Sequence, residues 1–214
     1  MIYTLTSCEL INSMGTDLAV VNSARVSFNQ LADEPELTQR DIKLLNYLAD
    51  HGHTSPFEHC TATFYIKCPL FIARQIMRHR TFSYNEVSRR YTSEKVEFWA
   101  PDHMRAQATK NLQCSDGLAD DQEFNAEVYD NAIDYAWSAY KQLITKGVAR
   151  EQARAVLPQA MHTSFYMTGN LLNWVRFIKL RDSEHAQPEA QEVARAIKQE
   201  LNDLFPHSMK AWFK

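Results

Sequence analysis

The scarcity of glycine constrains this chain more than any other feature of its sequence. Only five of the 214 residues are glycine, whereas a typical soluble domain contains about 7%, or roughly fifteen in a chain of this length. The five lie at least 22 residues apart. This spacing excludes the turns G-x-G-x-x-G and G-x-x-x-x-G-K-[ST], which bind nucleotide phosphates through backbone N–H groups. A nucleotide-binding protein with this sequence must therefore bind the phosphates with side chains.

The overall composition is that of an ordinary globular protein. Hydrophobic residues make up 45% of the chain, charged residues 23%, and the net charge is −3, so neither disorder nor general binding of polyanions is indicated. No apolar run approaches the ~20 residues that span a bilayer, and Met1–Leu5 carries no basic leader. The four cysteines form no C-x-x-C pair, which is typical of a reducing compartment. We therefore expect a cytoplasmic protein without a membrane segment or signal peptide.

Two segments alternate between apolar and polar residues, the period-two pattern of a half-buried β-strand. The first covers residues 60–68, with Cys60, Ala62, Phe64, Ile66 and Cys68 on one face. The second covers residues 161–168, with Met161, Thr163, Phe165 and Met167 on one face. Both are rich in β-branched or aromatic residues, which favour strands. We predict a strand at each and place Cys60 and Cys68 in the core.

The remaining apolar residues recur mainly every three or four positions, which indicates helices. This spacing is clearest in residues 124–146 and near the C-terminus, where Pro188 suits the first turn of a helix through Leu204. Further helices are predicted at residues 14–27, at residues 37–50 and from Pro69 to about Arg80. The predicted fold class is therefore α+β, an antiparallel or mixed sheet flanked by several helices. It forms a single domain over residues 1–214, with a polar loop at residues 101–123.

Basic residues are concentrated in residues 74–91. This segment contains five arginines, no lysine and only one acidic residue, Glu86. A guanidinium binds phosphate through two hydrogen bonds, whereas an ammonium acts as a point charge. We expect Phe71, Gln75, Arg78 and His79 to share one helix face, followed by a loop at residues 83–88 that can bind a polar heterocycle. An exposed basic loop and a nucleic-acid patch are the alternatives. No RNP, zinc-finger or helix-turn-helix pattern is present, which favours a small anionic ligand.

These residues also match the motif of a known family. Arg78-His79-Arg80, followed after seven residues by Ser88, resembles the signature of the flavin-dependent thymidylate synthases (the ThyX family). Nine positions are in register: Arg78, His79, Arg80, Ser83, Asn85, Glu86, Ser88, Arg90 and Tyr91. A match of this length is far more specific than a three-residue motif. Residues 53–59, residues 154–158, Asn170, Arg181 and residues 185–187 also resemble family segments, so the resemblance covers roughly residues 50–205.

The resemblance implies an activity and a set of small-molecule partners. The family methylates dUMP to dTMP, with methylenetetrahydrofolate as carbon donor, FAD as redox cofactor and NADPH as reductant. It implies a homotetramer whose active sites are shared between subunits. It implies neither a nucleic-acid polymer, nor a membrane, nor a bound metal as partner.

The resemblance also assigns residues to each ligand. Arg181 and Ser88 are the expected catalytic residues. The expected dUMP-binding residues are Gln75, Arg78, Glu86, Val87, Ser88, Arg89, Arg90, Arg154 and Arg181. The expected FAD-binding residues are His53, Ser55, Glu58, Arg78, His79, Arg80, Asn85, Glu86, Asn170, Arg176 and His185. Arg90 and Arg154 suit the phosphate of dUMP, and Arg181 suits the uracil ring. A cation at the ring amide stabilises the ionised uracil and makes its carbon-5 a better nucleophile.

Helix geometry gives a further expectation for Arg181. Asn170 and Arg181 are eleven residues apart, about three turns of α-helix, so both are expected on one face with Trp174 and Phe177 between them. The alternative is an amphipathic surface helix whose C-terminus carries Arg181. Where the family commonly has an arginine two residues after Asn170, this chain has Leu172. Arg176 is the substitute that we expect for a flavin contact.

Three other interpretations are less favoured. His51, His53, Glu58 and His59 resemble part of a zinc site, but no distant partner with matching spacing is present, and no metal is predicted. Ser88 with His79 suggests a nucleophile and its base, but the sequence has no G-x-S-x-G elbow. A catalytically idle nucleotide- or RNA-binding module on the same scaffold is the alternative of a different class.

The tryptophans Trp99, Trp137 and Trp212 are expected to pack, and Trp174 to lie in the core or beside the flavin.

Overall fold

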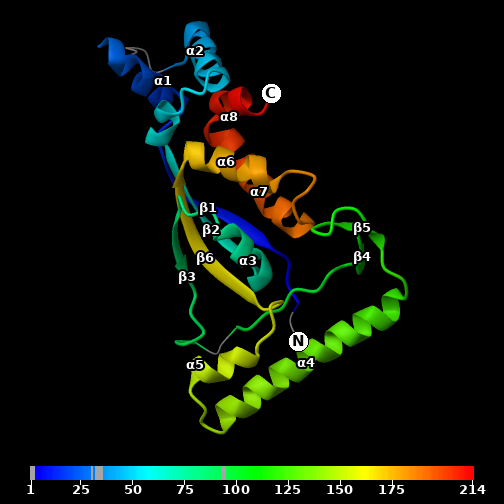
Figure 1. Cartoon of the computed structure of the whole chain (residues 1–214). Helices are drawn as coiled ribbons and strands as arrows, with labels where there is room; N and C mark the ends of the chain where they lie inside the picture. Colours follow the sequence, from blue (N-terminus) through cyan, green and yellow to red (C-terminus); the bar gives the residue numbers. More distant parts are fainter. Residues whose placement is uncertain (1–2, 30, 32–35, 93–94) are drawn as a thin grey trace.

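The computed structural model of the chain describes residues 3–29, 31, 36–92 and 95–214. At its centre is a four-stranded sheet in the order β1-β2-β6-β3, in which every neighbouring pair is antiparallel (Figure 1). The strands are β1 (Ser7–Met14), β2 (Thr61–Pro69), β6 (His162–Asn170) and β3 (Ser83–Glu86). The predicted α+β class with a helix-flanked antiparallel sheet is confirmed.

The two strands predicted from alternation are the two central strands of the sheet. β2 begins and ends one residue later than predicted, and β6 extends the predicted segment to Asn170. Phe64, Ile66 and Phe165 are buried while Tyr65 is exposed, as a half-buried strand requires. Cys60 and Cys68 are fully buried, as predicted.

The helix predicted at residues 14–27 is wrong at its start. Residues up to Met14 form edge strand β1, and α1 spans only Asp17–Arg25, with Thr16 as its N-cap. Gly15 separates them at φ +90, and a Cβ at this position would collide with Cys60. Strand and helix meet at this turn because only glycine combines a left-handed backbone with so close an approach.

The other helices agree more closely with the sequence pattern. α2 (Gln39–Asp50) begins with a capping box between Thr38 and Asp41. The remaining α-helices are α3 (Leu70–Ile76), α4 (Gln122–Thr145), α5 (Arg150–Ala153), α6 (Leu171–Arg181), α7 (Pro188–Leu204) and α8 (Pro206–Trp212). Short 3₁₀ segments occur at Val26–Phe28, Ser55–His59 and Arg154–Val156. No helix in the described part of the chain has both the length and the apolar character needed to cross a membrane.

The main core lies on one face of the sheet. α3, α6 and α7 cover this face (Figure 1), and Trp174, Phe177 and Ile197 from the helices pack with Phe64 and Phe165 from the strands. The indole N–H of Trp174 donates to the carbonyl oxygens of Ala62 (3.2 Å) and Gly169 (3.1 Å). Trp174 is therefore a core residue, which resolves one of the two expectations for it.

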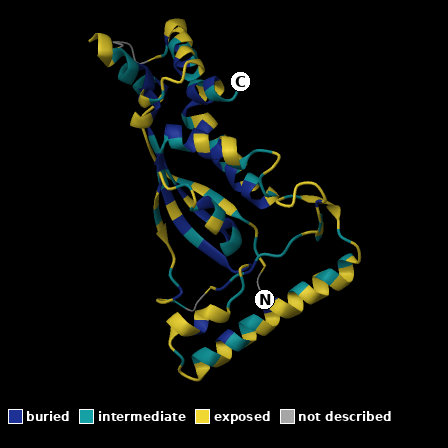
Figure 2. Ribbon diagram, viewed as in Figure 1, coloured by how far each residue is buried: buried dark blue, intermediate teal, exposed yellow. Residues whose placement is uncertain are grey.

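The long helix α4 is an arm with little burial. Figure 2 shows it exposed along most of its length, and only Ile133 and Tyr140 are buried. Tyr135 on the same helix is 83% exposed. Trp137 stacks on Tyr140 at 5.5 Å, Trp99 contacts Phe71 at 5.2 Å and Trp212 contacts Phe57 at 5.3 Å, so the three tryptophans predicted to pack do so.

The polar segment predicted as a loop at residues 101–123 is only partly irregular. It contains a two-stranded sheet of β4 (Arg105–Gln107) and β5 (Ser115–Leu118), and α4 starts at Gln122. Arg105 anchors this sheet to the start of α7 through a 2.6 Å ion pair with Glu189. Sequence alone did not reveal the anchor, because the two residues are 84 positions apart.

Candidate active site

The basic segment 74–91 is divided between a helix, a turn and a strand. The helix predicted to reach about Arg80 is too long, because α3 ends at Ile76. The Tyr84 hydroxyl donates to the carbonyl oxygens of Ile76 (3.2 Å) and His79 (2.8 Å). Since these contacts satisfy carbonyls that a longer helix would need, they stabilise a turn here. The predicted helix face is therefore wrong beyond Gln75, and residues 78–80 lie in the turn.

The predicted loop at residues 83–88 is wrong for its first four residues, which form β3. Their polar side chains suggest a loop, but their backbone groups pair with β6. Asn85 lies opposite Tyr166, and Glu86 lies opposite Phe165. Because side chains alternate along a strand, Asn85 projects to the outer face of the sheet and Glu86 to the inner face. The strand thus separates two residues that are adjacent in sequence.

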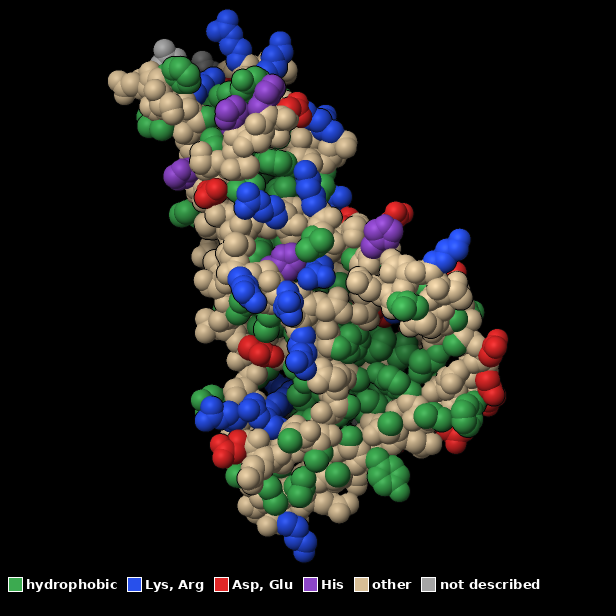
Figure 3. Space-filling view, viewed as in Figure 1, with side chains coloured by type: hydrophobic (Ala, Val, Ile, Leu, Met, Phe, Trp, Pro, Cys, Tyr) green, Lys and Arg blue, Asp and Glu red, His purple; other side chains and the backbone are tan. Residues whose placement is uncertain are grey.

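Arg181 is held at the end of α6 by two hydrogen bonds. Its Nε donates to His79 Nε2 at 3.0 Å, and its Nη2 donates to the Gln75 carbonyl oxygen at 2.8 Å. We call Arg181, His79 and Gln75 the Arg181 cluster. It unites three residues from α3, the following turn and α6, all of them expected around the nucleotide or the flavin. Figure 3 shows basic side chains gathered on the face formed by α3 and α6.

The imidazole in the Arg181 cluster is neutral. Burial, together with the charge of Arg181, lowers the pKa of His79 from 6.5 to about 4. Since Nε2 accepts the hydrogen bond from Arg181, the ring proton lies on Nδ1. Burial also lowers the pKa of Arg181. A neutral acceptor thus fixes the guanidinium without neutralising its charge.

Two further contacts support the Arg181 cluster. The Gln75 side chain donates to Gln187 Oε1 at 2.6 Å, which joins α3 to the segment before α7. The ring of Phe177 meets the ring of His79 edge-on at 4.9 Å. Both His79 and Gln75 are therefore held from two sides.

A second group of expected residues lines a cavity of about 480 Å³ at the end of β3. We call it the β3 cavity. Its walls include five of the predicted dUMP-binding residues, Glu86, Val87, Ser88, Arg89 and Arg154, together with Leu70, Glu151, Ala155, Leu157, Met161 and Thr163. The structure thus brings together residues from β3 and from the 3₁₀ turn after α5, which are more than sixty positions apart in the chain.

The two arginines of the β3 cavity differ in burial. Arg89 is buried, its Nη2 donates to the Lys95 carbonyl oxygen at 3.2 Å, and burial lowers its pKa. Arg154 is exposed at the start of a 3₁₀ turn. An exposed guanidinium beside a buried one suits a phosphate group, because one reaches solvent and the other is fixed.

The remaining predicted dUMP residues lie outside the β3 cavity walls. Gln75 and Arg181 belong to the Arg181 cluster, and Arg78 is exposed in the turn after α3. Arg90 is also exposed, with its guanidinium 5.8 Å from the centre of the Tyr91 ring. Within one chain, the predicted dUMP set is therefore divided between two places.

The predicted FAD residues are spread over the surface. His53, Ser55 and Glu58 are exposed around the 3₁₀ segment that precedes β2. His53 belongs to a stack of exposed rings, 5.8 Å from Tyr47 and 6.4 Å from His51. The other exposed members are Arg78, Arg80, Asn85, Glu86, Arg176 and His185.

The prediction that one helix carries both Asn170 and Arg181 needs a correction at Asn170. Asn170 precedes α6 as its N-cap, and its side-chain oxygen accepts a hydrogen bond from the Asn173 N–H at 2.9 Å. Trp174 and Phe177, expected on the ligand side, are fully buried against the sheet. Leu172 is buried too, so the position that differs from the family pattern faces the core.

Neither alternative catalytic arrangement is assembled. The Ser88 hydroxyl accepts a hydrogen bond from the Arg90 N–H at 3.3 Å, whereas His79 bonds Arg181. No hydrogen bond joins Ser88 to His79 in the described ranges. Among the residues that the structure describes, no group of three or more His, Cys, Asp or Glu side chains is arranged to hold a metal ion.

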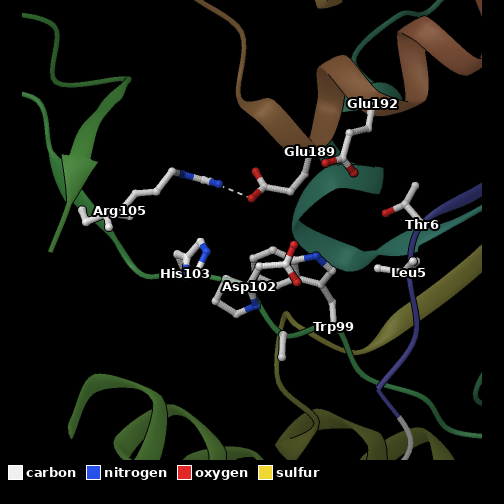
Figure 4. A pocket seen from close by; sticks show the side chains of 11 residues that line it. Leu5, Thr6, Trp99, Asp102, His103, Arg105, Glu189 and Glu192 are labelled. Atoms are coloured by element: carbon white, nitrogen blue, oxygen red, sulfur yellow. Dashed lines mark hydrogen bonds and ion pairs between the residues drawn. The ribbon is translucent and has the colours of Figure 1, made fainter. Parts of the chain in front are cut away.

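Another cavity, of about 270 Å³, lies where β4 meets α7, and sequence reasoning missed it (Figure 4). Figure 4 shows Arg105 reaching from β4 to Glu189 at the start of α7. Burial and the charges of Glu189 and Asp102 raise the pKa of Glu192 in the cavity wall. This cavity contains no residue from either predicted ligand set. Its contacts join the small sheet to the body of the molecule.

Comparison with known proteins finds a family and relatives that match almost the whole chain. The family model described as Thy1, thymidylate synthase complementing protein, matches residues 9–207. The flavin-dependent thymidylate synthase of Thermosipho africanus is 40% identical over 208 residues, covering 96% of this chain and 90% of that protein. The flavin-dependent thymidylate synthase of Thermus thermophilus is 42% identical over 204 residues, covering 95% of this chain and 74% of that protein. The crystal structure of the UMP/dUMP methylase PolB from Streptomyces cacaoi, bound with 5-Br dUMP, superposes with a TM-score of 0.88 at 33% identity and covers 99% of this chain and 96% of that one.

Proposed function

Because this chain belongs to the flavin-dependent thymidylate synthase family and is a methyltransferase, we propose that it converts dUMP to dTMP. In this proposal methylenetetrahydrofolate supplies the carbon, FAD is the redox cofactor and NADPH is the reductant. The observation that carries the proposal is the match to named thymidylate synthases along almost the whole chain at about 40% identity. A catalytically idle binding module on the same scaffold is the alternative of a different class, and it predicts that the protein forms no dTMP.

The Arg181 cluster supports a role for Arg181 at the uracil ring. The guanidinium is fixed by His79 and Gln75 through its Nε and Nη2 atoms, and five N–H groups in all allow it to donate to a ring oxygen as well. A cation held in place stabilises the charge that develops on uracil as carbon-5 attacks, and no reorganisation is needed during the reaction. Ser88, the second proposed catalytic residue, lines the β3 cavity, where its hydroxyl can bind dUMP.

The β3 cavity supports binding of the nucleotide phosphate. Arg154 and Arg89 supply two guanidinium groups there, and Arg90 is exposed nearby in sequence. These side chains take the place of a glycine-rich loop. All five glycines have other uses: four have positive φ, and the fifth, Gly169, lies against the ring of Phe82.

The residues present also fit FAD. Arg78 and Arg80 are exposed on either side of the inward-turned His79, so two guanidinium groups are available to the two charges of a pyrophosphate. His53 with its neighbouring rings offers a flat aromatic surface. We propose that these residues hold the cofactor together with Ser55, Glu58, Asn85, Glu86, Asn170, Arg176 and His185. When bound, the flavin supplies the redox chemistry, while the protein binds, orients and polarises.

We further propose a homotetramer whose sites are shared between subunits. The predicted dUMP residues are divided between the Arg181 cluster and the β3 cavity, which supports this proposal. The Arg181 cluster of one copy and the β3 cavity of another copy can together form one complete site. Exposed apolar side chains on α4, such as Phe124 and Tyr135, and the exposed pair Tyr65 and Tyr166 on the outer sheet face also favour contacts with other copies. All four cysteines are free thiols, which is consistent with the proposed cytoplasmic location.

Purification and assay test the proposal directly. Purified protein is expected to be yellow, to release FAD on denaturation and to form dTMP from dUMP only when methylenetetrahydrofolate and NADPH are present. Protein that cannot be loaded with FAD would refute the proposed function. A second candidate substrate is UMP, because the solved relative is named a UMP/dUMP methylase. Parallel assays with UMP and dUMP decide between them, and we expect dUMP to be preferred.

A further inference from the structure

Thr163 is a polar residue in an otherwise apolar row of the sheet. It lies on β6 in register with Cys68, and it shares the inner face with Phe165 and Met167. Only 3% of Thr163 is exposed. A hydroxyl at so buried a position is costly unless it makes a hydrogen bond.

The partner of Thr163 is the carboxylate of Glu86. Its hydroxyl donates to Glu86 Oε1 at 2.6 Å, the short distance expected for a hydroxyl bonded to an ionised group. The sheet register explains the contact. Glu86 lies directly opposite Phe165, and Thr163 is two residues away on the same face, so the pair is a diagonal neighbour within reach of a long side chain.

This hydrogen bond leaves one side of the carboxylate free. No second hydrogen bond to the Glu86 carboxylate occurs within the described part of the chain. Thr163 and Glu86 both line the β3 cavity, together with Ser88, Arg89 and Arg154. A glutamate at the end of a strand has three rotatable bonds, and one oxygen fixed to a buried hydroxyl restricts them all.

We propose that Thr163 is a positioning residue for the substrate, one that holds Glu86 so that its second oxygen accepts a hydrogen bond from a donor group of the nucleotide. The inference deepens the proposed function and rests on it. It adds to the nucleotide site a residue that touches no ligand itself. In an unpositioned state Glu86 would lie beside Arg89 and Arg154 in several orientations, some of which would compete with the phosphate for the guanidinium groups.

A matched pair of variants tests the proposal. Thr163→Val keeps the shape and the β-branch that suit a strand but removes the donor. Thr163→Ser keeps the donor and removes only the methyl group. We expect Thr163→Val to weaken dUMP binding to the FAD-loaded enzyme about tenfold or more, as for loss of a hydrogen bond to a charged group. Thr163→Ser is expected to bind dUMP within about twofold of the wild type, and both variants are expected to load FAD normally.

A double-mutant cycle separates positioning from a general structural effect. In a Glu86→Ala background the hydroxyl has nothing left to position, so adding Thr163→Val is expected to change dUMP affinity by less than about twofold. Equal losses from Thr163→Val in both backgrounds would overturn the inference, as would unchanged dUMP affinity in Thr163→Val alone. If the wild-type enzyme itself binds no dUMP, the proposed function fails instead, so the two failures are distinguishable.

Discussion

Arg181 and the exposed arginines differ in how the protein holds them. Arg181 donates two hydrogen bonds to protein acceptors, one of them a neutral histidine. Arg78, Arg80, Arg90 and Arg154 are exposed. A fixed guanidinium suits a reaction in which charge appears at one atom, because it needs no rearrangement. An exposed guanidinium suits binding, because a phosphate can reach it from solvent. The difference predicts effects on turnover at one place and on affinity at the other.

Removing the fixed cation should have the largest effect. Arg181→Ala is expected to reduce the rate of dTMP formation about 10²- to 10³-fold, the usual loss on removing a donor that stabilises transition-state charge. FAD loading should persist, because the core residues of α6 are unchanged. Single-turnover kinetics and flavin absorbance measure both. Arg195→Ala, which removes another hydrogen-bonded arginine on neighbouring α7, is the control. Wild-type turnover in Arg181→Ala would refute the role.

A mixing experiment tests whether the Arg181 cluster and the β3 cavity belong to one site shared between subunits. Arg181→Ala and Arg154→Glu should each be nearly inactive, the second because a carboxylate would repel the phosphate. If one site takes its two halves from different subunits, mixing and reassembling the two variants should restore about a quarter of wild-type activity by statistical combination. No recovery after subunit exchange would mean that one chain supplies both halves. Native mass measurement confirms that exchange has occurred.

Removing an exposed arginine should affect affinity more than rate. Arg154→Ala is expected to raise KM for dUMP about tenfold, as for loss of a charge-assisted hydrogen bond, with kcat changed less. The effect should shrink at high salt, because exposed charges are screened. Arg150→Ala, one turn earlier on α5 and outside the cavity walls, is the control. If Arg154→Ala lowered kcat as much as Arg181→Ala does, the proposed difference between fixed and exposed arginines would be refuted.

The smallest effect concerns pH and stability. The pKa of His79 is about 4 in the folded protein against 6.5 ordinarily. The unfolded chain therefore takes up this proton first, and stability falls as pH drops from about 6.5 to about 4. His162, buried with its pKa also lowered to about 4, contributes in the same direction. His79→Gln, which keeps an acceptor for Arg181, should make the pH dependence shallower by less than the limit of about 1.4 kcal/mol per pH unit for one proton.

Urea unfolding at several pH values measures this slope. His59→Gln, the same substitution at an exposed position, is the matched control. An identical slope in His79→Gln and the wild type would contradict a neutral His79.

Local patterns predicted the centre of the fold well. The alternation in residues 60–68 and 161–168 identified β2 and β6 because each has one face in the core and one outside it. Edge strand β1 was missed, since all of its residues are at least partly exposed and a bulge near Leu10 interrupts its register. β3 was missed because only its backbone, paired with β6, makes it a strand.

The candidate site was predicted in its membership but not in its connections. The family resemblance identified Gln75, His79 and Arg181 individually, yet nothing in the local sequence indicates that Arg181 donates hydrogen bonds to the other two residues. That contact spans 102 positions between Arg181 and His79 and depends on where α3 ends. The hydroxyl of Tyr84, eight positions after Ile76, stabilises the turn that follows α3. Two residues that line the β3 cavity were not predicted as site residues, Thr163 and Glu151. Thr163 could have been noticed in the sequence as a polar residue in an apolar row, whereas no sequence pattern pointed to Glu151.

The brevity of β3 has a consequence for how this gene can vary. In four residues the strand presents Asn85 to one side of the sheet and Glu86 to the other. Inserting or deleting a single residue there would exchange the two sides and carry the carboxylate away from Thr163. A substitution in β3 alters the contacts of one side chain, but a change of length shifts the β3–β6 register and alters the contacts of every side chain in the strand. Natural insertions should therefore be tolerated far better in the polar segment at residues 101–123 than between Ser83 and Glu86.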